Sequence, residues 1–194
     1  MERNSTYKYP IVISSPNAIE KEVEQLLALF AQGLQVFHLR KPQWLYKDSE
    51  RFLEQVPQEY HDRLVLHQHY DLVSCYDLRG IHGRFTPEDV KGFSTKRIST
   101  STHTIQEFND LPMYYDYAFL SPIFPSISKS GYASTEDWEM TLKQRTNYHT
   151  KLIALGGVHA DRVPSIHSMS FDGYALLGAI WSVPHGIKNF ERCL

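Results

Sequence analysis

The amino-acid sequence predicts an α/β fold, a compact single-domain (β/α)8 TIM barrel in which eight parallel strands close into a ring surrounded by helices. Three observations carry this prediction. Eight short apolar runs recur along the 194 residues, amphipathic stretches separate them, and the mean spacing of about 24 residues suits a strand followed by a helix. An open doubly wound sheet shares this alternation, but the count of eight favours the closed barrel. The length suits one domain, residues 1–194.

The predicted strands are rich in Val, Ile and aromatic residues. They lack strict polar alternation, as do strands that are buried on both faces. They cover residues 11–15, 36–40, 64–68, 80–83, 97–102, 117–124, 151–157 and 173–180.

Helices are expected between these strands. Apolar residues at helical spacing predict a helix over residues 18–30, and Gly33 stops it. Thr104 followed by Glu107 reads as a capping box at the start of another helix. Further helices are expected over residues 135–144, 160–167 and 186–193, with abbreviated ones near 70–76 and 86–91.

Composition restricts the possible partners and compartment. The formal net charge is -2, so no global basic field attracts nucleic acid or an anionic membrane. No apolar run approaches the roughly 20 residues that span a bilayer, and the polar first ten residues do not read as a signal peptide. Cys75 and Cys193 suggest neither a zinc knuckle nor a disulfide framework. We therefore expect a cytoplasmic protein with no nucleic-acid or membrane partner.

In a barrel of this kind the active site lies where the strands end. The residues at these ends are polar, cationic or glycine. They include His38, Arg40, Lys41, His67, Gln68, His82, Arg84, Ser101, Gly157, Leu177 and Gly178. We expect His38, Lys41, His67, Gln68 and Arg84 to bind the substrate or its phosphate groups, although basic residues such as Arg40 and Lys41 could also be solvated strand ends. The set contains no Ser-His-Asp arrangement and no pair of carboxylates, which argues against a nucleophile-based hydrolase or a glycosidase.

The last two strands predict a phosphate site. Gly156 and Gly157 end the seventh strand, and Gly178 lies in the eighth. Loops after these strands bind phosphate through backbone N–H groups in many barrels, and glycine allows the close approach. A tight turn in a crowded corner is the alternative interpretation.

The segment after the sixth strand carries Ser126, Ser128 and Lys129. Hydroxyl groups and an ammonium near a glycine suit a mobile clamp on a pyrophosphate. A solvated surface loop has the same composition.

Three histidines end neighbouring strands: His38, His67 and His82. Imidazoles brought together in this way could bind a transition metal or carry protons. They could also be polar walls of a pocket, and the sequence leaves these interpretations open.

Several blocks match, in order and spacing, the motifs of one enzyme family. His38-Leu39-Arg40 matches its Gln-Leu-Arg motif, and residues 121–129 match Gly-Pro-x-Phe-Pro-Thr-x-Thr-Lys with serines for threonines. Residues 154–158 match Ala-Ile-Gly-Gly-Ile, and residues 173–180 match its eighth strand. Along nearly its whole length the chain resembles the thiamine phosphate synthase (thiamine phosphate pyrophosphorylase) family, which includes thiazole tautomerase-type paralogues.

This resemblance implies a transferase of thiamine biosynthesis. It would join hydroxymethylpyrimidine diphosphate to thiazole phosphate and release pyrophosphate. The implied roles are pyrophosphate binding by Arg40 and Lys129 with help from Ser126 and Ser128, thiazole phosphate binding near Gly157, Leu177 and Gly178, and contact with the pyrimidine by Ser101.

The resemblance also implies Mg²⁺, held by two aspartates after the third and fourth strands. Gln68 stands at the first of these positions, and Arg84 opens the region of the second. One hypothesis is that Arg84 and the histidines supply fixed positive charge in place of Mg²⁺. The metal's identity therefore stays open.

Three functions remain after these departures. The first is the synthase, and Pro122 supports it because the tautomerase branch carries a catalytic histidine there. The others are an isomerase or salvage enzyme acting on a thiazole phosphate or related phosphorylated heterocycle, and a non-catalytic thiamine-phosphate binder. Tyr114 and Tyr115 could line a homo-oligomer interface or lie exposed on a monomer.

Overall fold

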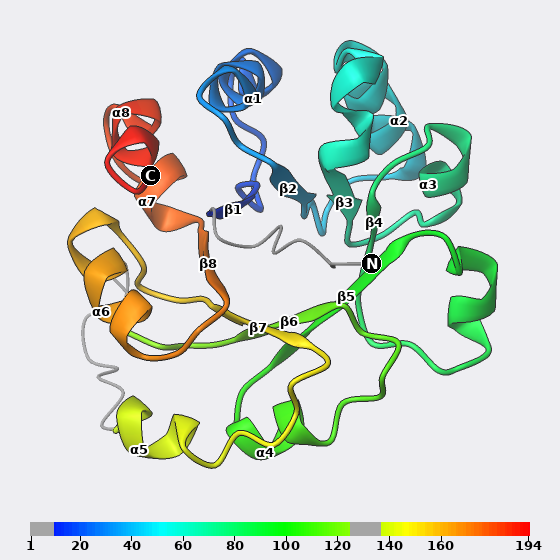
Figure 1. The fold of residues 1–194 in the computed structure, drawn as a ribbon. Coiled ribbons are helices and arrows are strands. Elements are labelled where there is room, and N and C mark those ends of the chain that lie inside the picture. The colour runs from blue at the N-terminus through cyan, green and yellow to red at the C-terminus, as the bar shows by residue number, and fades with distance from the viewer. Residues whose placement is uncertain (1–9, 125–136) are drawn as a thin grey trace.

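The computed structural model describes residues 10–124 and 137–194. Its eight strands follow one another around a closed barrel in chain order, and every neighbouring pair is parallel, including β8 with β1. Figure 1 shows the helices arranged around this ring of strands. The predicted (β/α)8 barrel is confirmed.

The strands are short, and most of the helices are too. The strands are β1 (Ile11–Ile13), β2 (Val36–Leu39), β3 (Leu64–Leu66), β4 (Gly80–His82), β5 (Arg97–Thr102), β6 (Tyr117–Leu120), β7 (Lys151–Ala154) and β8 (Gly173–Leu176). The α-helices are α1 (Glu22–Ala31), α2 (Tyr46–Gln55), α3 (Asp71–Cys75), α4 (Ile105–Asn109), α5 (Trp138–Leu142), α6 (Val163–Ser168), α7 (Gly178–Trp181) and α8 (Gly186–Glu191). Short 3-10 helices cover Gln58–Arg63, Asp89–Phe93 and Ala160–Arg162.

Several predicted boundaries were wrong. Most predicted strands extend past the observed carboxyl ends, by one to four residues that lie at the mouth of the barrel. The predicted eighth strand ends at Leu176, and Gly178 instead begins α7. Residues 89–93 form a 3-10 turn, and α2 was missed altogether.

Two helix signals are confirmed. The Thr104 side chain accepts a hydrogen bond from the Glu107 amide at 3.1 Å, so Thr104 caps α4. The Glu107 carboxylate reaches back to the His103 amide at 2.9 Å. The first helix ends at Ala31, and Gly33 follows it with φ +97°, a conformation that suits glycine.

The hydrophobic core has two layers. An inner cluster fills the barrel, and Ile11, Ile13, Val36 and Tyr117 belong to it. The alternate residues of the same strands face outward and pack under the helices in a larger cluster. Because Val36 faces inward, His38 two positions later projects to the same side, and it lies at the carboxyl end of the barrel interior.

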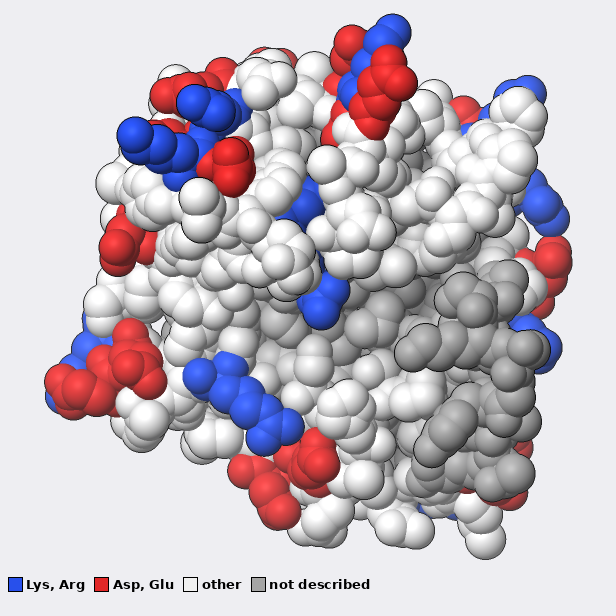
Figure 2. All heavy atoms as spheres, turned by 180° about the vertical axis from the view of Figure 1, so that it is seen from behind, with Lys and Arg blue, Asp and Glu red and all other residues white. Residues whose placement is uncertain are grey.

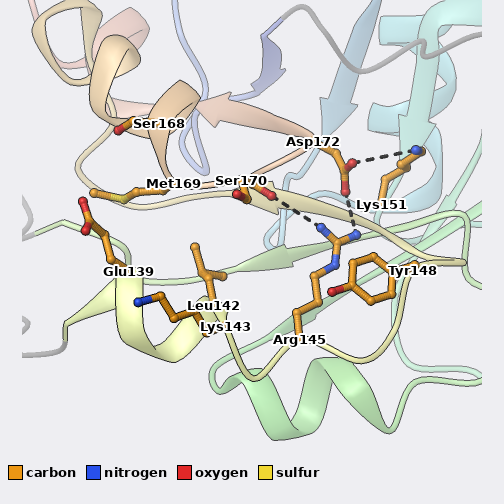
Figure 3. Close-up of a pocket in the computed structure, with 10 residues that line it drawn as sticks. All are labelled: Glu139, Leu142, Lys143, Arg145, Tyr148, Lys151, Ser168, Met169, Ser170 and Asp172. Atoms are coloured by element: carbon orange, nitrogen blue, oxygen red, sulfur yellow. Dashed lines mark hydrogen bonds and ion pairs between the residues drawn. The ribbon is translucent and has the colours of Figure 1, made fainter.

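A cavity of about 620 Å³ lies at the opposite end of the barrel, beside residues that precede β7 and β8. Figure 3 shows Arg145 on one side of this cavity, directed toward Asp172 and beside Tyr148. The guanidinium donates to the Asp172 carboxylate at 2.8 Å and to the Thr150 carbonyl at 3.2 Å. These contacts tie the loops together, so this cavity is built around a structural ion pair.

Within the described residues, no helix combines the length and the apolar character needed to cross a membrane.

Candidate active site at the carboxyl ends of the strands

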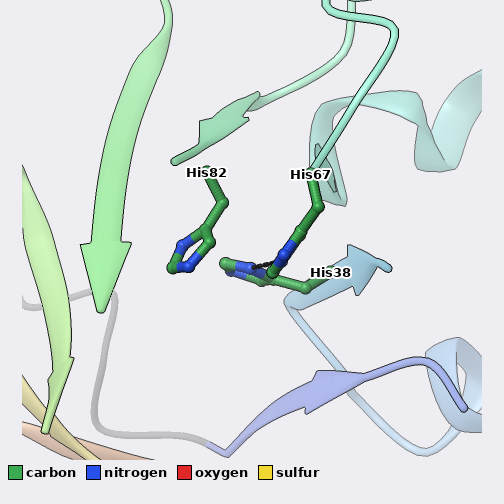
Figure 4. A group of neighbouring side chains, drawn as sticks. All are labelled: His38, His67 and His82. Atoms are coloured by element: carbon green, nitrogen blue, oxygen red, sulfur yellow. Dashed lines mark hydrogen bonds between the residues drawn. The ribbon is translucent and has the colours of Figure 1, made fainter. Parts of the chain in front are cut away.

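Three imidazoles meet inside the mouth of the barrel. Figure 4 shows His38 from β2, His67 from the loop after β3 and His82 from β4 directed toward one another. His38 Nδ1 lies 2.9 Å from His67 Nε2, and the rings of His67 and His82 stack with centroids 4.2 Å apart. One ligand nitrogen from each of the three rings lies within 4.8 Å of the others. The predicted proximity of these histidines is confirmed.

Hydroxyl groups from β5 and β6 hold the outer nitrogens of these rings. His38 Nε2 lies 2.6 Å from the Tyr117 hydroxyl. His82 Nδ1 lies 2.9 Å from Ser99 Oγ, and His82 Nε2 lies 3.0 Å from Ser101 Oγ. Ser101, predicted to contact a pyrimidine, therefore lies in the histidine cluster. Tyr117 and Ser99 were not predicted as site residues, since only the three-dimensional fold brings them to His38 and His82.

Burial keeps the three imidazoles neutral. Desolvation lowers the pKa of His38 and of His67 well below the usual value, and the neighbouring histidines add to this effect. Desolvation, with a smaller contribution from Arg40, lowers the pKa of His82 to about 3. The hypothesis that these histidines supply fixed positive charge is therefore wrong near neutral pH.

Arg40 provides positive charge at this site. Its side chain is exposed, and its charge contributes to lowering the pKa of both His67 and His82, which places the guanidinium close to them. The Arg40 backbone is fixed by Ser14, whose hydroxyl accepts from the Arg40 amide at 2.8 Å and donates to its carbonyl at 3.1 Å. This pairing positions the end of β2 against the end of β1.

The charges on one face of the molecule are unevenly distributed. Figure 2 shows Lys and Arg side chains near the middle of this face, while Asp and Glu side chains gather toward its margin. A local concentration of positive charge can attract an anionic ligand even when the net charge is slightly negative.

Lys41 occupies a different environment from its neighbour Arg40. Its side chain is 1% exposed, and its ammonium donates to the Glu22 carboxylate at 2.5 Å and to the Asn17 carbonyl at 2.8 Å. Burial raises the pKa of Glu22, while the pairing with Lys41 opposes this effect. The Lys41 ammonium is therefore unavailable to a phosphate in this structure, contrary to the expected role.

Gln68 also has a structural contact. Its side-chain amide donates to the Lys41 carbonyl at 2.7 Å and to the Trp44 carbonyl at 3.2 Å. These bonds hold the loop after β2 against the end of β3. The side chain that was expected to bind substrate or phosphate is thus used to fix this loop.

The described residues at the mouth do not fit Mg²⁺. This ion prefers oxygen ligands, usually carboxylates and water. Gln68 and Arg84 stand where carboxylates were expected, and Glu22 is paired with Lys41. Among the described residues, the group of three or more metal-ligating side chains is the histidine cluster, which offers nitrogen.

The remaining predicted residues lie at the same end of the barrel, except for those outside the described ranges. Gly156 and Gly157 follow β7 with φ of +97° and +65°. A Cβ atom at Gly156 would approach Pro122 Cα to 2.9 Å, so this turn requires glycine.

Leu177 and Gly178 follow β8. Arg84 is exposed beside a cavity of about 340 Å³ that Ser101 also lines. Ser126, Ser128 and Lys129 lie outside the described residues.

Comparison with known proteins agrees with this architecture. The family described as thiamine monophosphate synthase matches residues 9–180. The chain belongs to this family. Its resemblance to thiamine phosphate synthases, seen in the sequence motifs, is thereby confirmed.

Individual members of the thiamine monophosphate synthase family are moderately similar to the chain. It is 27% identical over 149 residues to the thiamine-phosphate synthase of Staphylococcus carnosus, covering 73% of this chain and 70% of the relative. A crystal structure of thiamine phosphate pyrophosphorylase from Bacteroides thetaiotaomicron superposes with a TM-score of 0.78 at 30% identity, covering 95% of each chain. The enzyme of the same name from Pyrococcus furiosus, at 17% identity with a TM-score of 0.74, shares the fold over 95% of this chain and 93% of that one.

Proposed function

We propose that this protein joins hydroxymethylpyrimidine diphosphate to thiazole phosphate and releases pyrophosphate. The observation that carries the proposal is the place of Arg40, an exposed cation beside a cluster of neutral rings at the carboxyl end of the barrel. Both substrates are small phosphorylated heterocycles, and the family is one of transferases that act on such molecules. The fold and the anionic character of the substrates thus fit the site.

The proposed reaction requires the carboxyl end of the barrel to stabilise two opposite charges that develop in the transition state. As the bond between the pyrimidine methylene carbon and the diphosphate oxygen breaks, negative charge grows on the leaving pyrophosphate and positive charge on the pyrimidine. Arg40 would stabilise the pyrophosphate, and fixed charges of this kind account for a large share of catalysis in many enzymes. Lys129, with Ser126 and Ser128, would share this role.

The pyrimidine would lie against the histidine cluster and its hydroxyls. Ser101, at 3.0 Å from His82 Nε2, would contact the pyrimidine. Gly157, Leu177 and Gly178 would bind the thiazole phosphate through backbone groups.

Thiamine phosphate formation by wild-type protein and by Arg40→Ala tests this assignment. Loss of one charge that stabilises the transition state lowers a rate by about 100-fold or more, so the rate of Arg40→Ala should fall by this factor. Arg51→Ala is the matched control, because Arg51 is an exposed arginine on α2. Equal rates in the two variants would contradict the role of Arg40. No product from the wild-type protein would contradict the proposed function and favour a binder or a different enzyme.

A further inference from the structure

We propose that His38, His67 and His82 bind one divalent transition-metal ion that prefers imidazole nitrogen, such as Zn²⁺ or Co²⁺. This site goes beyond the proposed synthase function, which assigns no metal to these residues. Its position inside the barrel mouth places the ion where Ser101 and the exposed Arg40 also lie.

The geometry of the cluster is the first argument. One nitrogen from each ring lies within 4.8 Å of the others, and the closest pair, His38 Nδ1 and His67 Nε2, is 2.9 Å apart. An ion with Zn–N bonds of about 2.0–2.1 Å in tetrahedral geometry separates its ligand nitrogens by roughly 3.4 Å. The cluster therefore needs shifts of about 1 Å to bind one ion. His67 can supply part of this shift, because it is only partly buried and follows β3 in a loop.

The hydrogen bonds of Ser99 fix the tautomer of His82. Ser99 Oγ donates its proton to the Ile81 carbonyl at 3.2 Å, so it accepts from His82 Nδ1–H at 2.9 Å. His82 Nε2 therefore carries a lone pair. Histidines that bind zinc usually donate the N–H that faces away from the ion to a hydrogen-bond acceptor, as His82 does to Ser99.

Tyr117 can play the same part for His38. Its hydroxyl lies 2.6 Å from His38 Nε2, on the far side of the ring from Nδ1. One proton occupies the 2.9 Å contact between His38 Nδ1 and His67 Nε2. An ion that binds between the two nitrogens displaces this proton to the other nitrogen of the ring that carries it, and His38 Nε2–H then donates to the Tyr117 oxygen. The rings remain neutral and no net proton is released.

The ligand set matches the chemistry of zinc-type ions. Transition metals bind neutral imidazole, and a site with three protein nitrogens leaves one coordination position open. Ser101 donates its hydroxyl proton to the lone pair of His82 Nε2 at 3.0 Å, so this hydroxyl has to turn away when an ion binds, and its oxygen then lies beside the open position. The charge of Arg40 opposes a cation, but its exposure to water screens this repulsion, and the same charge favours an anionic fourth ligand.

Titration of the metal-stripped full-length protein with Zn²⁺ and Co²⁺ tests the proposal. We expect one high-affinity ion per chain, visible absorption from tetrahedral Co²⁺, and no displacement by excess Mg²⁺. His67→Gln and His82→Gln should each weaken binding by about 100-fold or more, and Ser99→Ala by about tenfold. His149→Ala is the matched control because His149 is exposed and lies outside the cluster.

Affinities of His67→Gln and His82→Gln within twofold of wild type would overturn the proposal, because other histidines would then hold the ion. X-ray absorption of the wild-type protein with one equivalent of Zn²⁺ provides a readout that requires no variant. Three imidazole ligands are expected, and a shell of oxygen ligands would overturn the site. Neither measurement depends on turnover, so failure here is distinguishable from failure of the proposed function.

Discussion

Acidification should destabilise this protein through its buried histidines. The folded-state pKa of His82 is about 3 against an ordinary value of 6.5. Between these values the unfolded chain binds a proton that the folded protein does not, so the free energy of unfolding falls as the pH decreases. At pH 7.5 both states are neutral and the effect is absent.

The size of this effect follows from the same two values. At pH 5 the pH lies 1.5 units below the ordinary pKa of the imidazole, so His82 is protonated in the unfolded chain and neutral in the folded protein. This difference lowers the free energy of unfolding by about 2 kcal/mol for His82 alone. His38 and His67 shift in the same direction and add to the loss. Arg40 contributes to the shift of His82, though less than burial does.

Urea unfolding of the metal-stripped protein at pH 7.5 and pH 5 measures the effect in wild type, His82→Gln and His149→Ala. Glutamine does not titrate, so the loss of stability between the two pH values should be smaller by about 2 kcal/mol in His82→Gln than in wild type. His149→Ala should behave as wild type, because His149 is exposed. Subtracting the loss in His82→Gln from the loss in wild type cancels the contributions of titrating groups that the two proteins share. An equal loss in wild type and His82→Gln would refute the claim that His82 is buried and neutral.

Three further substitutions test how the barrel is held together, each by urea unfolding at neutral pH. Glu22→Ala leaves the buried ammonium of Lys41 without its carboxylate and should cost about 3 kcal/mol; a loss below 1 kcal/mol would mean that water reaches Lys41. Asp172→Ala removes the partner of Arg145 at the opposite end of the barrel and should cost about 2 kcal/mol, with no change in metal affinity. Thr104→Ala removes the N-cap of α4 and should cost about 1 kcal/mol, whereas the more conservative Thr104→Ser should cost less.

The sequence was informative about the strands because most of them are buried on both faces. Such strands appear as continuous apolar runs, and their order determines the closed barrel. It was less informative about α2, which is mostly charged and polar on its exposed side and buries Phe52 and Leu53. The sequence did contain one signal, an aspartate at the third position of the helix. In the structure the Asp48 carboxylate accepts from the Leu45 amide at 3.0 Å in the first turn.

The proximity of the three histidines was predicted, but the chemistry of the cluster was not. Neighbouring strand ends were enough to bring His38, His67 and His82 together. Their neutrality depends on burial inside the barrel, and their tautomers depend on hydroxyls from β5 and β6. Lys41 was assigned to phosphate because it is a basic residue at the end of the second strand. Its carboxylate partner, Glu22, lies 19 residues earlier on α1, and the sequence alone does not reveal that pairing.

The most direct test of the account is product formation by the purified wild-type protein. Hydroxymethylpyrimidine diphosphate and thiazole phosphate would be supplied together and separately, with thiamine phosphate measured by mass spectrometry and Lys129→Ala as a control. The account predicts product only when both substrates are present, and much less in Lys129→Ala. If the protein binds thiazole phosphate but forms no more product than a protein-free mixture, the barrel retains a phosphate site without the proposed reaction, and the central claim is contradicted.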